Sequence, residues 1–101
     1  MDVVNAIAKA RFSSAKAQRI GLCKGRDLRG AMLCLEPAQE VRVERGQWAY
    51  YVVTGAARLV AGGKSMDIAT GQLAVSQADE SHVLANIGEN RLICLAFGQG
   101  V

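Results

Sequence analysis

The chain has 101 residues, of which half are hydrophobic and 21% are charged, and its formal net charge is +3. This composition is that of one globular domain and excludes an intrinsically disordered chain. The longest apolar runs are about five to seven residues, far too short to span a bilayer.

The start of the chain and its cysteines predict a cytoplasmic protein with reduced thiols. Asp2 precedes the first base, and no charged leader stands before an apolar block, so we expect no signal peptide. Cys23, Cys34 and Cys94 are an odd number and include no CxxC pair, so we expect neither disulfides nor zinc ligation. Cys34 and Cys94 stand in apolar runs and are predicted to be inert core residues.

Positive charge is concentrated in the first 30 residues. Seven bases and two acids there give a balance of +5, whereas residues 31–101 carry five bases and seven acids, a balance of −2. Such asymmetry can mark an arm that binds nucleic acid or an anionic surface. Because the bases are dispersed and Phe12 is the only aromatic residue among them, we interpret this segment as a solvated arm and expect no nucleic-acid partner.

The first third of the chain predicts a short helix followed by one strand. Apolar residues at Val3, Val4, Ile7 and Ala8 form a stripe that favours one or two helical turns over residues 2–11. Residues 19–23 read as a short strand, and the polar turn 24–27 ends it.

From residue 28 onward the pattern predicts only strands. Short apolar runs recur about every ten residues and are separated by turn residues, which indicates a β-sandwich or barrel. Gly62 and Gly63 predict a tight hairpin, because two-residue hairpin turns require positive φ. We expect one domain, with residues 1–27 as an N-terminal arm and first strand and residues 28–101 as the barrel. The expected strands are 31–35, 48–53, 58–61, 73–75, 82–85 and 92–97.

The segment 71–86 carries the most specific pattern in the chain. Gly71, an apolar run, a polar turn, His82 and then Asn86 resemble the second conserved motif of the cupins, although Gln77 and Asp79 replace its usual proline and inner glycine. Residues 48–55 resemble the strand that closes the first cupin motif on a glycine. The resemblance extends over residues 28–97 and implies a cupin-type, RmlC-like jelly-roll β-barrel of two antiparallel sheets.

The resemblance also implies a metal site that this chain has lost. The family binds metal with two histidines and a glutamate from the first motif and one histidine from the second. In this chain the glutamate position is Trp48, and the two histidine positions are either Arg42 and Glu44 or Val41 and Val43. Only Glu44, in one register, is a conventional ligand, so we expect no metal and no other cofactor.

The sequence leaves the register of this strand open. If Arg42 and Glu44 point inward, both charges lose water and must pair, and Arg42 is then a candidate anchor for a carboxylate or phosphate. If Val41 and Val43 point inward, the cavity mouth is apolar. We favour the valine register because desolvating two charges is costly.

The candidate pocket residues are Trp48, Tyr50, His82 and Leu84. His82 is the only histidine and has two interpretations: a candidate catalytic general base, or a pocket histidine hydrogen-bonded to a tyrosine or to the backbone. Trp48 and Tyr50 lie on one face of their strand and are either core residues or walls of a ligand site.

The leading functional hypothesis is a metal-free, non-catalytic cupin that binds a small molecule inside the barrel. The alternative is a cupin isomerase, lyase or dioxygenase-like enzyme that uses His82 as acid and base, with Tyr50 as partner, or as the sole retained metal ligand. A third hypothesis is an interaction module whose basic arm contacts an acidic partner.

We also expect a homodimer. Tyr51 and Val53 lie on the strand face opposite Trp48 and Tyr50, so both faces of this strand are apolar. One small barrel cannot bury both faces, and exposed apolar patches usually mark association.

Overall fold

A computed structural model gives the fold and describes residues 1–43, 46–77 and 80–98. These residues form one 3-10 turn and nine strands: η1 (Ile7–Lys9), β1 (Gln18–Lys24), β2 (Arg29–Leu35), β3 (Glu40–Val43), β4 (Trp48–Thr54), β5 (Ala56–Ala61), β6 (Lys64–Ala69), β7 (Leu73–Val75), β8 (His82–Asn86) and β9 (Leu92–Gly98). Among them, no helix is long and apolar enough to cross a membrane.

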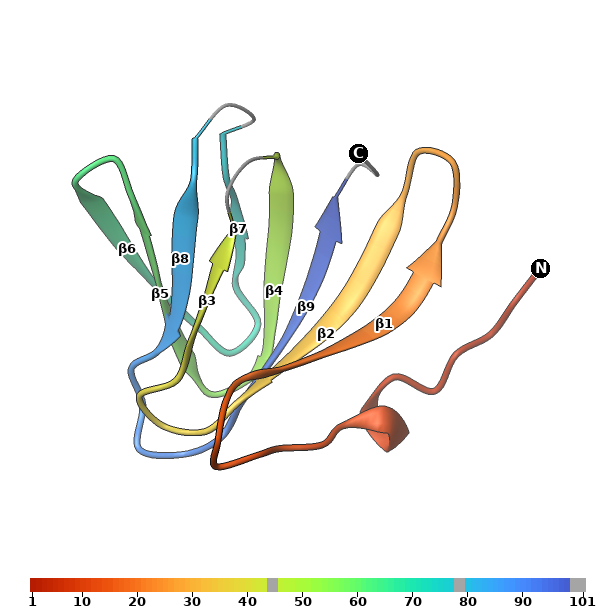
Figure 1. Ribbon diagram of the computed structural model, residues 1–101, viewed down its shortest axis with the longest axis horizontal. Helices are drawn as coiled ribbons and strands as arrows, with labels where there is room; N and C mark the ends of the chain where they lie inside the picture. Colours follow the sequence, from red (N-terminus) through yellow and green to blue (C-terminus); the bar gives the residue numbers. More distant parts are fainter. Residues whose placement is uncertain (44–45, 78–79, 99–101) are drawn as a thin grey trace.

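The strands form two antiparallel sheets that face each other (Figure 1). One sheet has the order β1-β2-β9-β4-β7 and the other has the order β3-β8-β5-β6. The sheets diverge toward the end of the molecule that carries the β5–β6 turn. This arrangement confirms the predicted all-β jelly roll.

All the expected strands are present, the first-motif strand whose register the sequence left open forms as β3, and one further strand, β6, was missed. β3 and β6 form the two edges of the four-stranded sheet. In β6 only Met66 and Ile68 alternate with polar residues, a pattern too short to mark a strand in sequence, and Ile68 is its only buried residue.

Three glycines at strand ends adopt positive φ. Ala61 pairs with Lys64, and the intervening Gly62 and Gly63 have φ values of +56° and +78°, which confirms the tight hairpin. Gly55, the closing glycine of the first motif, has a φ of +106°, and a Cβ there would lie 2.9 Å from the carbonyl oxygen of Arg91.

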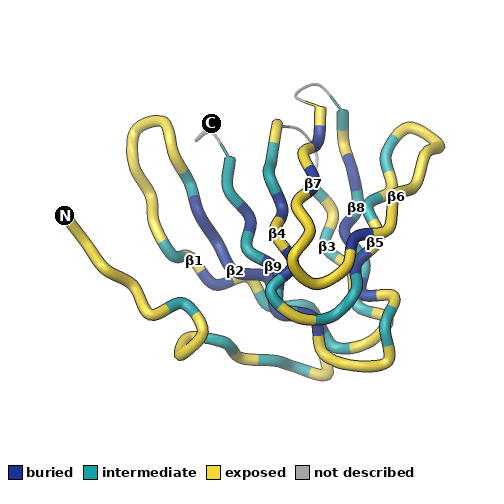
Figure 2. The backbone as a smooth tube through the Cα atoms, turned by 180° about the vertical axis from the view of Figure 1, so that it is seen from behind, coloured by how far each residue is buried: buried dark blue, intermediate teal, exposed yellow. Residues whose placement is uncertain are grey.

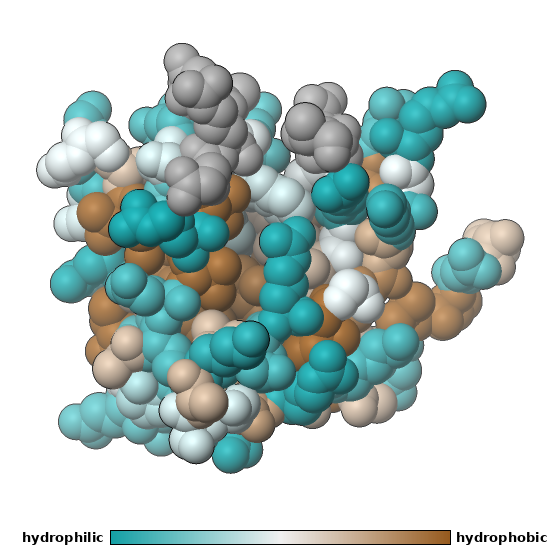
Figure 3. All heavy atoms as spheres, in the orientation of Figure 1, coloured by the Kyte–Doolittle hydropathy of each residue, from teal (hydrophilic) through white to brown (hydrophobic). Residues whose placement is uncertain are grey.

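The helical prediction for residues 2–11 holds for a single turn. Only the three-residue turn η1 forms, and the apolar stripe does not dock on the sheets: Val3, Val4 and Ile7 are 97%, 40% and 53% exposed. Apolar side chains of the arm therefore project at the edge of the molecule (Figure 3). So short a helix is unstable in water without docking.

The main core lies between the two sheets, and buried residues recur along the central strands (Figure 2). Alternation puts residues i and i+2 on the same face of a strand, so each strand contributes a row of inward side chains. The largest of these are Leu33, Leu35, Tyr50, Val52, Leu84, Leu92 and Cys94.

A second cluster covers the outer face of the five-stranded sheet. Ile20, Met32 and Cys34 are buried there because Ala10 and Phe12 of the arm pack on them. The arm therefore covers the outer face of β1 and β2. The strand β1 itself pairs with β2 along its length.

The end of the arm is fixed by polar contacts with two loops. The Arg91 guanidinium lies 4.4 Å from the centre of the Phe12 ring, and its Nε lies 2.8 Å from the Glu36 carboxylate. Gln39 Nε2 donates a hydrogen bond of 2.6 Å to the carbonyl of Ser13. These contacts tie residues 12–13 to the barrel.

Candidate functional site

His82 and Tyr50 meet between the two sheets. His82 opens β8 in one sheet, Tyr50 lies in the middle of β4 in the other, and the Tyr50 hydroxyl is 2.5 Å from His82 Nε2. The rings are arranged edge to face, with centroids 5.5 Å apart. The side chains are 2% and 1% exposed, so the hydrogen bond is fully buried.

Burial keeps both members of this pair uncharged at neutral pH. Desolvation lowers the pKa of His82, and the backbone and carboxylate of nearby Glu80 oppose the shift. Desolvation also raises the pKa of the Tyr50 hydroxyl, with a contribution from Cys94 and opposition from Arg19. A neutral phenol is therefore hydrogen-bonded to a neutral imidazole.

No described residue makes a hydrogen bond of regular geometry to the other ring nitrogen, Nδ1, although the Glu80 backbone interacts with the ring closely enough to oppose the fall of its pKa. This nitrogen is also buried. Most buried polar atoms in proteins are hydrogen-bonded, and an exception needs an explanation.

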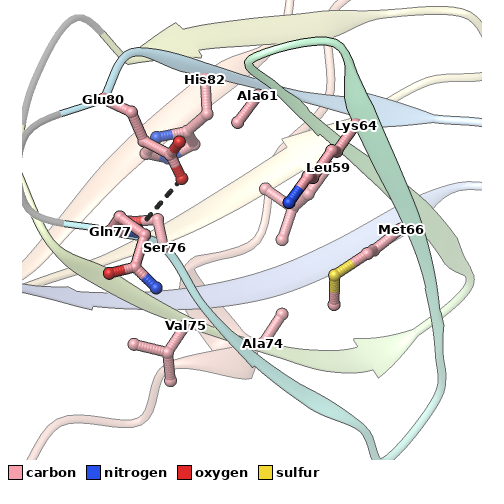
Figure 4. A pocket seen from close by; sticks show the side chains of 10 residues that line it. All are labelled: Leu59, Ala61, Lys64, Met66, Ala74, Val75, Ser76, Gln77, Glu80 and His82. Carbon is pink, nitrogen blue, oxygen red and sulfur yellow. Dashed lines mark hydrogen bonds between the residues drawn. The ribbon is translucent and has the colours of Figure 1, made fainter.

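His82 borders a pocket of about 240 Å³ at the wide end of the barrel (Figure 4). The β5–β6 hairpin forms one side of the pocket, and β7 with the segment leading into β8 forms the other. Its lining residues are Leu59, Ala61, Lys64, Met66, Ala74, Val75, Ser76, Gln77, Glu80 and His82.

The structure separates the four residues predicted to line one pocket. Only His82 borders the large pocket. Trp48 and Tyr50 border a gap of about 10 Å³ on the other side of the interior, at the lower limit for a single water molecule. Leu84 is completely buried in the main core. Tyr50 is thus a core residue whose hydroxyl reaches His82.

Sequence reasoning missed the opposite wall of the pocket. Lys64 and Met66 project from β6, a strand that the apolar pattern did not reveal, and Glu80 comes from the turn before His82. A signal was available, because the predicted Gly62-Gly63 turn requires a partner strand for β5 after residue 63.

The structure confirms the valine register of β3. Val41 and Val43 are half-buried and border the small interior gap, whereas Arg42 is exposed. The idea that Arg42 anchors a ligand inside the barrel is therefore wrong. Glu44 lies outside the described residues.

The residues at the cupin metal position do not fit a metal ion. The inward positions of β3 are valines, the next motif position is Trp48, and the Nε2 of His82 is hydrogen-bonded to Tyr50. Among the described residues, no three His, Cys, Asp or Glu side chains cluster closely enough to hold a metal.

The buried cysteines do not complete such a site. Cys94 points into the main core, and burial raises the pKa of its thiol to about 12. Cys34 packs under the arm on the outer face of the sheet, and burial also raises its pKa. Thiols held in this way are poor ligands, since a metal binds the thiolate.

Asn86, the last residue of the second motif, has a structural role. Its side-chain amide donates to the carbonyls of Leu35 and Asn90, at 3.0 and 2.9 Å, and its oxygen accepts from the Gly88 amide at 2.9 Å. Asn86 is 3% exposed and fixes the loop between β8 and β9, away from the pocket.

No family model matches the chain, and no curated protein sequence is similar to it. The crystal structure of TT1209 from Thermus thermophilus is 19% identical, with a TM-score of 0.87 over 98% of each chain. An uncharacterized conserved protein with a double-stranded beta-helix domain from Klebsiella pneumoniae is 21% identical, with a TM-score of 0.86 over 96% of this chain and 83% of that chain. An RmlC-like cupin protein from Desulfovibrio desulfuricans is 14% identical, with a TM-score of 0.80 over 97% of this chain and 96% of that chain. At these identities the likeness concerns the fold alone.

Proposed function

We propose that this chain, a small cupin domain by its fold, binds a small molecule in the pocket beside His82 without a metal, another cofactor or catalysis. The observation that carries the proposal is the pocket of about 240 Å³ that His82 borders beside the β5–β6 hairpin. The mainly apolar lining with a few polar groups is typical of small-molecule sites.

The metal-free part of the proposal follows from the contacts of His82. A first-row metal needs an imidazole lone pair, and the Nε2 of His82 is already engaged in the hydrogen bond with the Tyr50 hydroxyl. Any further ligands would have to come from positions that hold valine and tryptophan in this chain.

The enzyme alternative also rests on His82 and is weakened by the same contact. A general base must present a free lone pair to the reacting proton. The Tyr50 hydroxyl occupies Nε2, and no described carboxylate hydrogen-bonds to Nδ1 to orient the ring as a base. Binding without catalysis needs no such arrangement.

The test is native mass spectrometry of the purified chain, followed by extraction of any bound molecule. We expect an associated mass below about 0.5 kDa, which is the range that a pocket of this size accepts. Ala61→Phe should abolish it, since half-buried Ala61 lines the pocket. Ala69→Phe, at an exposed position outside the lining, is the matched control. Absence of any associated mass, or equal retention in both variants, would contradict the proposal.

A cytoplasmic homodimer completes the proposal. The register places Ile20, Met32, Leu95, Tyr51 and Leu73 in one apolar row across the outer face of the five-stranded sheet. The arm buries the first two residues, whereas Tyr51 and Leu73 are 39% and 61% exposed. A second copy packed on this exposed half would remove it from water. The three unpaired cysteines are those of a protein in a reducing compartment.

A further inference from the structure

The two buried polar residues that line the pocket, His82 and Ser76, present no accessible polar group to it. The Nε2 of His82 is bonded to the Tyr50 hydroxyl, and its Nδ1 is buried. The Ser76 hydroxyl accepts a hydrogen bond of 2.9 Å from the backbone N–H of Trp48 and donates one of 3.3 Å to the carbonyl of Gly46. A bound molecule therefore finds no hydrogen-bond partner in either side chain.

The rest of the inner part of the pocket is aliphatic. Leu59 and Ala61 reach it from the β5–β6 hairpin, and Ala74 reaches it from β7 on the other side (Figure 4). Ala74 is 5% exposed, and Leu59 and Ala61 are half-buried. The backbone polar groups of a strand lie in the plane of its sheet, so side chains form the inner walls here.

The polar side chains of the described lining lie at the rim instead. Lys64 and Gln77 are exposed, and Glu80 is half-buried. Two apolar residues of the lining, Met66 and Val75, are also at the rim, because they are 62% and 57% exposed. Among the described residues, the pocket therefore changes from apolar at its inner end to mixed at its mouth.

We propose that the pocket takes an amphiphilic molecule whose aliphatic end inserts between Leu59 and Ala74, while its polar end stays in water at the rim. This inference rests on the proposed small-molecule function and adds the chemical class of the ligand and its orientation. A polar group at the inserted end would lose its hydration without gaining a hydrogen-bond partner.

The first test compares 1-hexanol with 1,6-hexanediol as probes of the full chain. The two molecules share a six-carbon chain and are uncharged, so the charges at the rim do not enter the comparison. In a nuclear magnetic resonance titration, 1-hexanol should shift the methyl resonances of Ala61 and Ala74, and 1,6-hexanediol should bind about tenfold more weakly. Equal affinities, or 1-hexanol binding that leaves both methyl groups unshifted, would overturn the inference.

The second test places a hydroxyl group at the inner end of the pocket. Ala74→Ser should raise the affinity for 1,6-hexanediol relative to 1-hexanol, because the inserted hydroxyl then has a partner. Ala61→Ser, at a half-buried position of the opposite wall, should have the same effect and does not disturb the core. Ala69→Ser, at an exposed position outside the lining, is the matched control and should leave the ratio unchanged. An unchanged ratio in both pocket variants would contradict the proposed orientation.

The outcomes separate this inference from the proposed function. If a molecule co-purifies with the chain but 1-hexanol does not bind, the inference fails while the proposed function stands. If nothing co-purifies and 1-hexanol does not bind, both fail.

Discussion

The Tyr50 hydroxyl lies 2.5 Å from Nε2 of His82, and this contact joins the two sheets through the histidine of the segment that resembles the second cupin motif. Tyr50 is 1% exposed and His82 is 2% exposed, so neither group can exchange this partner for water. The hydrogen bond therefore has consequences for stability, for pH dependence and for the pocket.

Replacing Tyr50 by phenylalanine should lower the free energy of unfolding by about 1–3 kcal/mol, because the buried Nε2 then lacks its donor. Tyr51→Phe is a matched control, since Tyr51 is the next residue of β4 and is 39% exposed on the opposite face. Urea unfolding of both variants measures the difference. Equal losses in the two variants would show that the hydrogen bond contributes nothing specific.

Stability should fall as the pH drops below the ordinary histidine pKa of 6.5. Desolvation lowers the pKa of folded His82, so the unfolded chain takes up the proton first and gains free energy from it. Glu80 opposes this shift, Tyr50 contacts the ring as a neutral phenol, and Lys64 lines the same pocket. The stabilisation that comes from keeping His82 neutral is fully present above pH 6.5, and it is lost as the pH falls from 6.5 toward the lower pKa of His82 in the folded state.

Urea midpoints between pH of about 7.5 and 5.5 measure this effect, because carboxylates with ordinary pKa values stay ionised over that range. His82→Gln should be nearly independent of pH over the same interval. A wild-type midpoint as flat as that of the variant would contradict a buried, neutral His82.

The arm should protect Cys34 from reaction. Cys23 is exposed, whereas Cys34 is completely buried beneath the arm residues Ala10 and Phe12. Phe12→Ala should therefore speed iodoacetamide labelling of Cys34 and leave Cys94, in the main core, unreactive. Peptide mapping by mass spectrometry follows each thiol separately. If the labelling of Cys34 and that of Cys94 become faster together, the variant has unfolded globally and the arm is not a local cover.

The proposed dimer should have a mass of about twice the 10.7 kDa of one chain in light scattering. Leu73→Lys should shift it to a monomer, because a lysine in an apolar interface loses hydration without a partner. Met66→Lys is the control, since Leu73 and Met66 are 61% and 62% exposed but lie on different sheets. A wild-type monomer, or dissociation in both variants, would contradict this interface.

The sequence could predict the fold because its signals are local. Strand alternation and turn residues such as Gly62 and Gly63 act within a few positions, and the structure reproduces them. Parity placed Tyr50 on the inner face, and a hydrogen bond from a tyrosine was one of two interpretations of His82. The local sequence pattern could not decide between the two interpretations of His82, because the decision depends on which strands face each other.

The pocket was harder to predict because its wall belongs to an edge strand. Met66 and Ile68 alternate with polar residues over only a few positions, and Lys64 and Met66 come to line a pocket with Glu80 only through the packing of the hairpin. The arm was also difficult to predict from local pattern. Its apolar stripe has helical spacing, but the arm residues that pack on the five-stranded sheet are Ala10 and Phe12, which lie outside that stripe.

The central claim is that His82 holds no metal. It is tested most directly by the metal content of the purified protein and by its melting temperature before and after chelation. Because Tyr50 holds Nε2 and the first motif lacks ligands, we expect far less than one transition metal per chain and no change in melting temperature with a chelator. Close to one iron, manganese, nickel or zinc per chain, with a melting temperature that falls on chelation, would contradict the account and make the enzyme hypothesis the leading one.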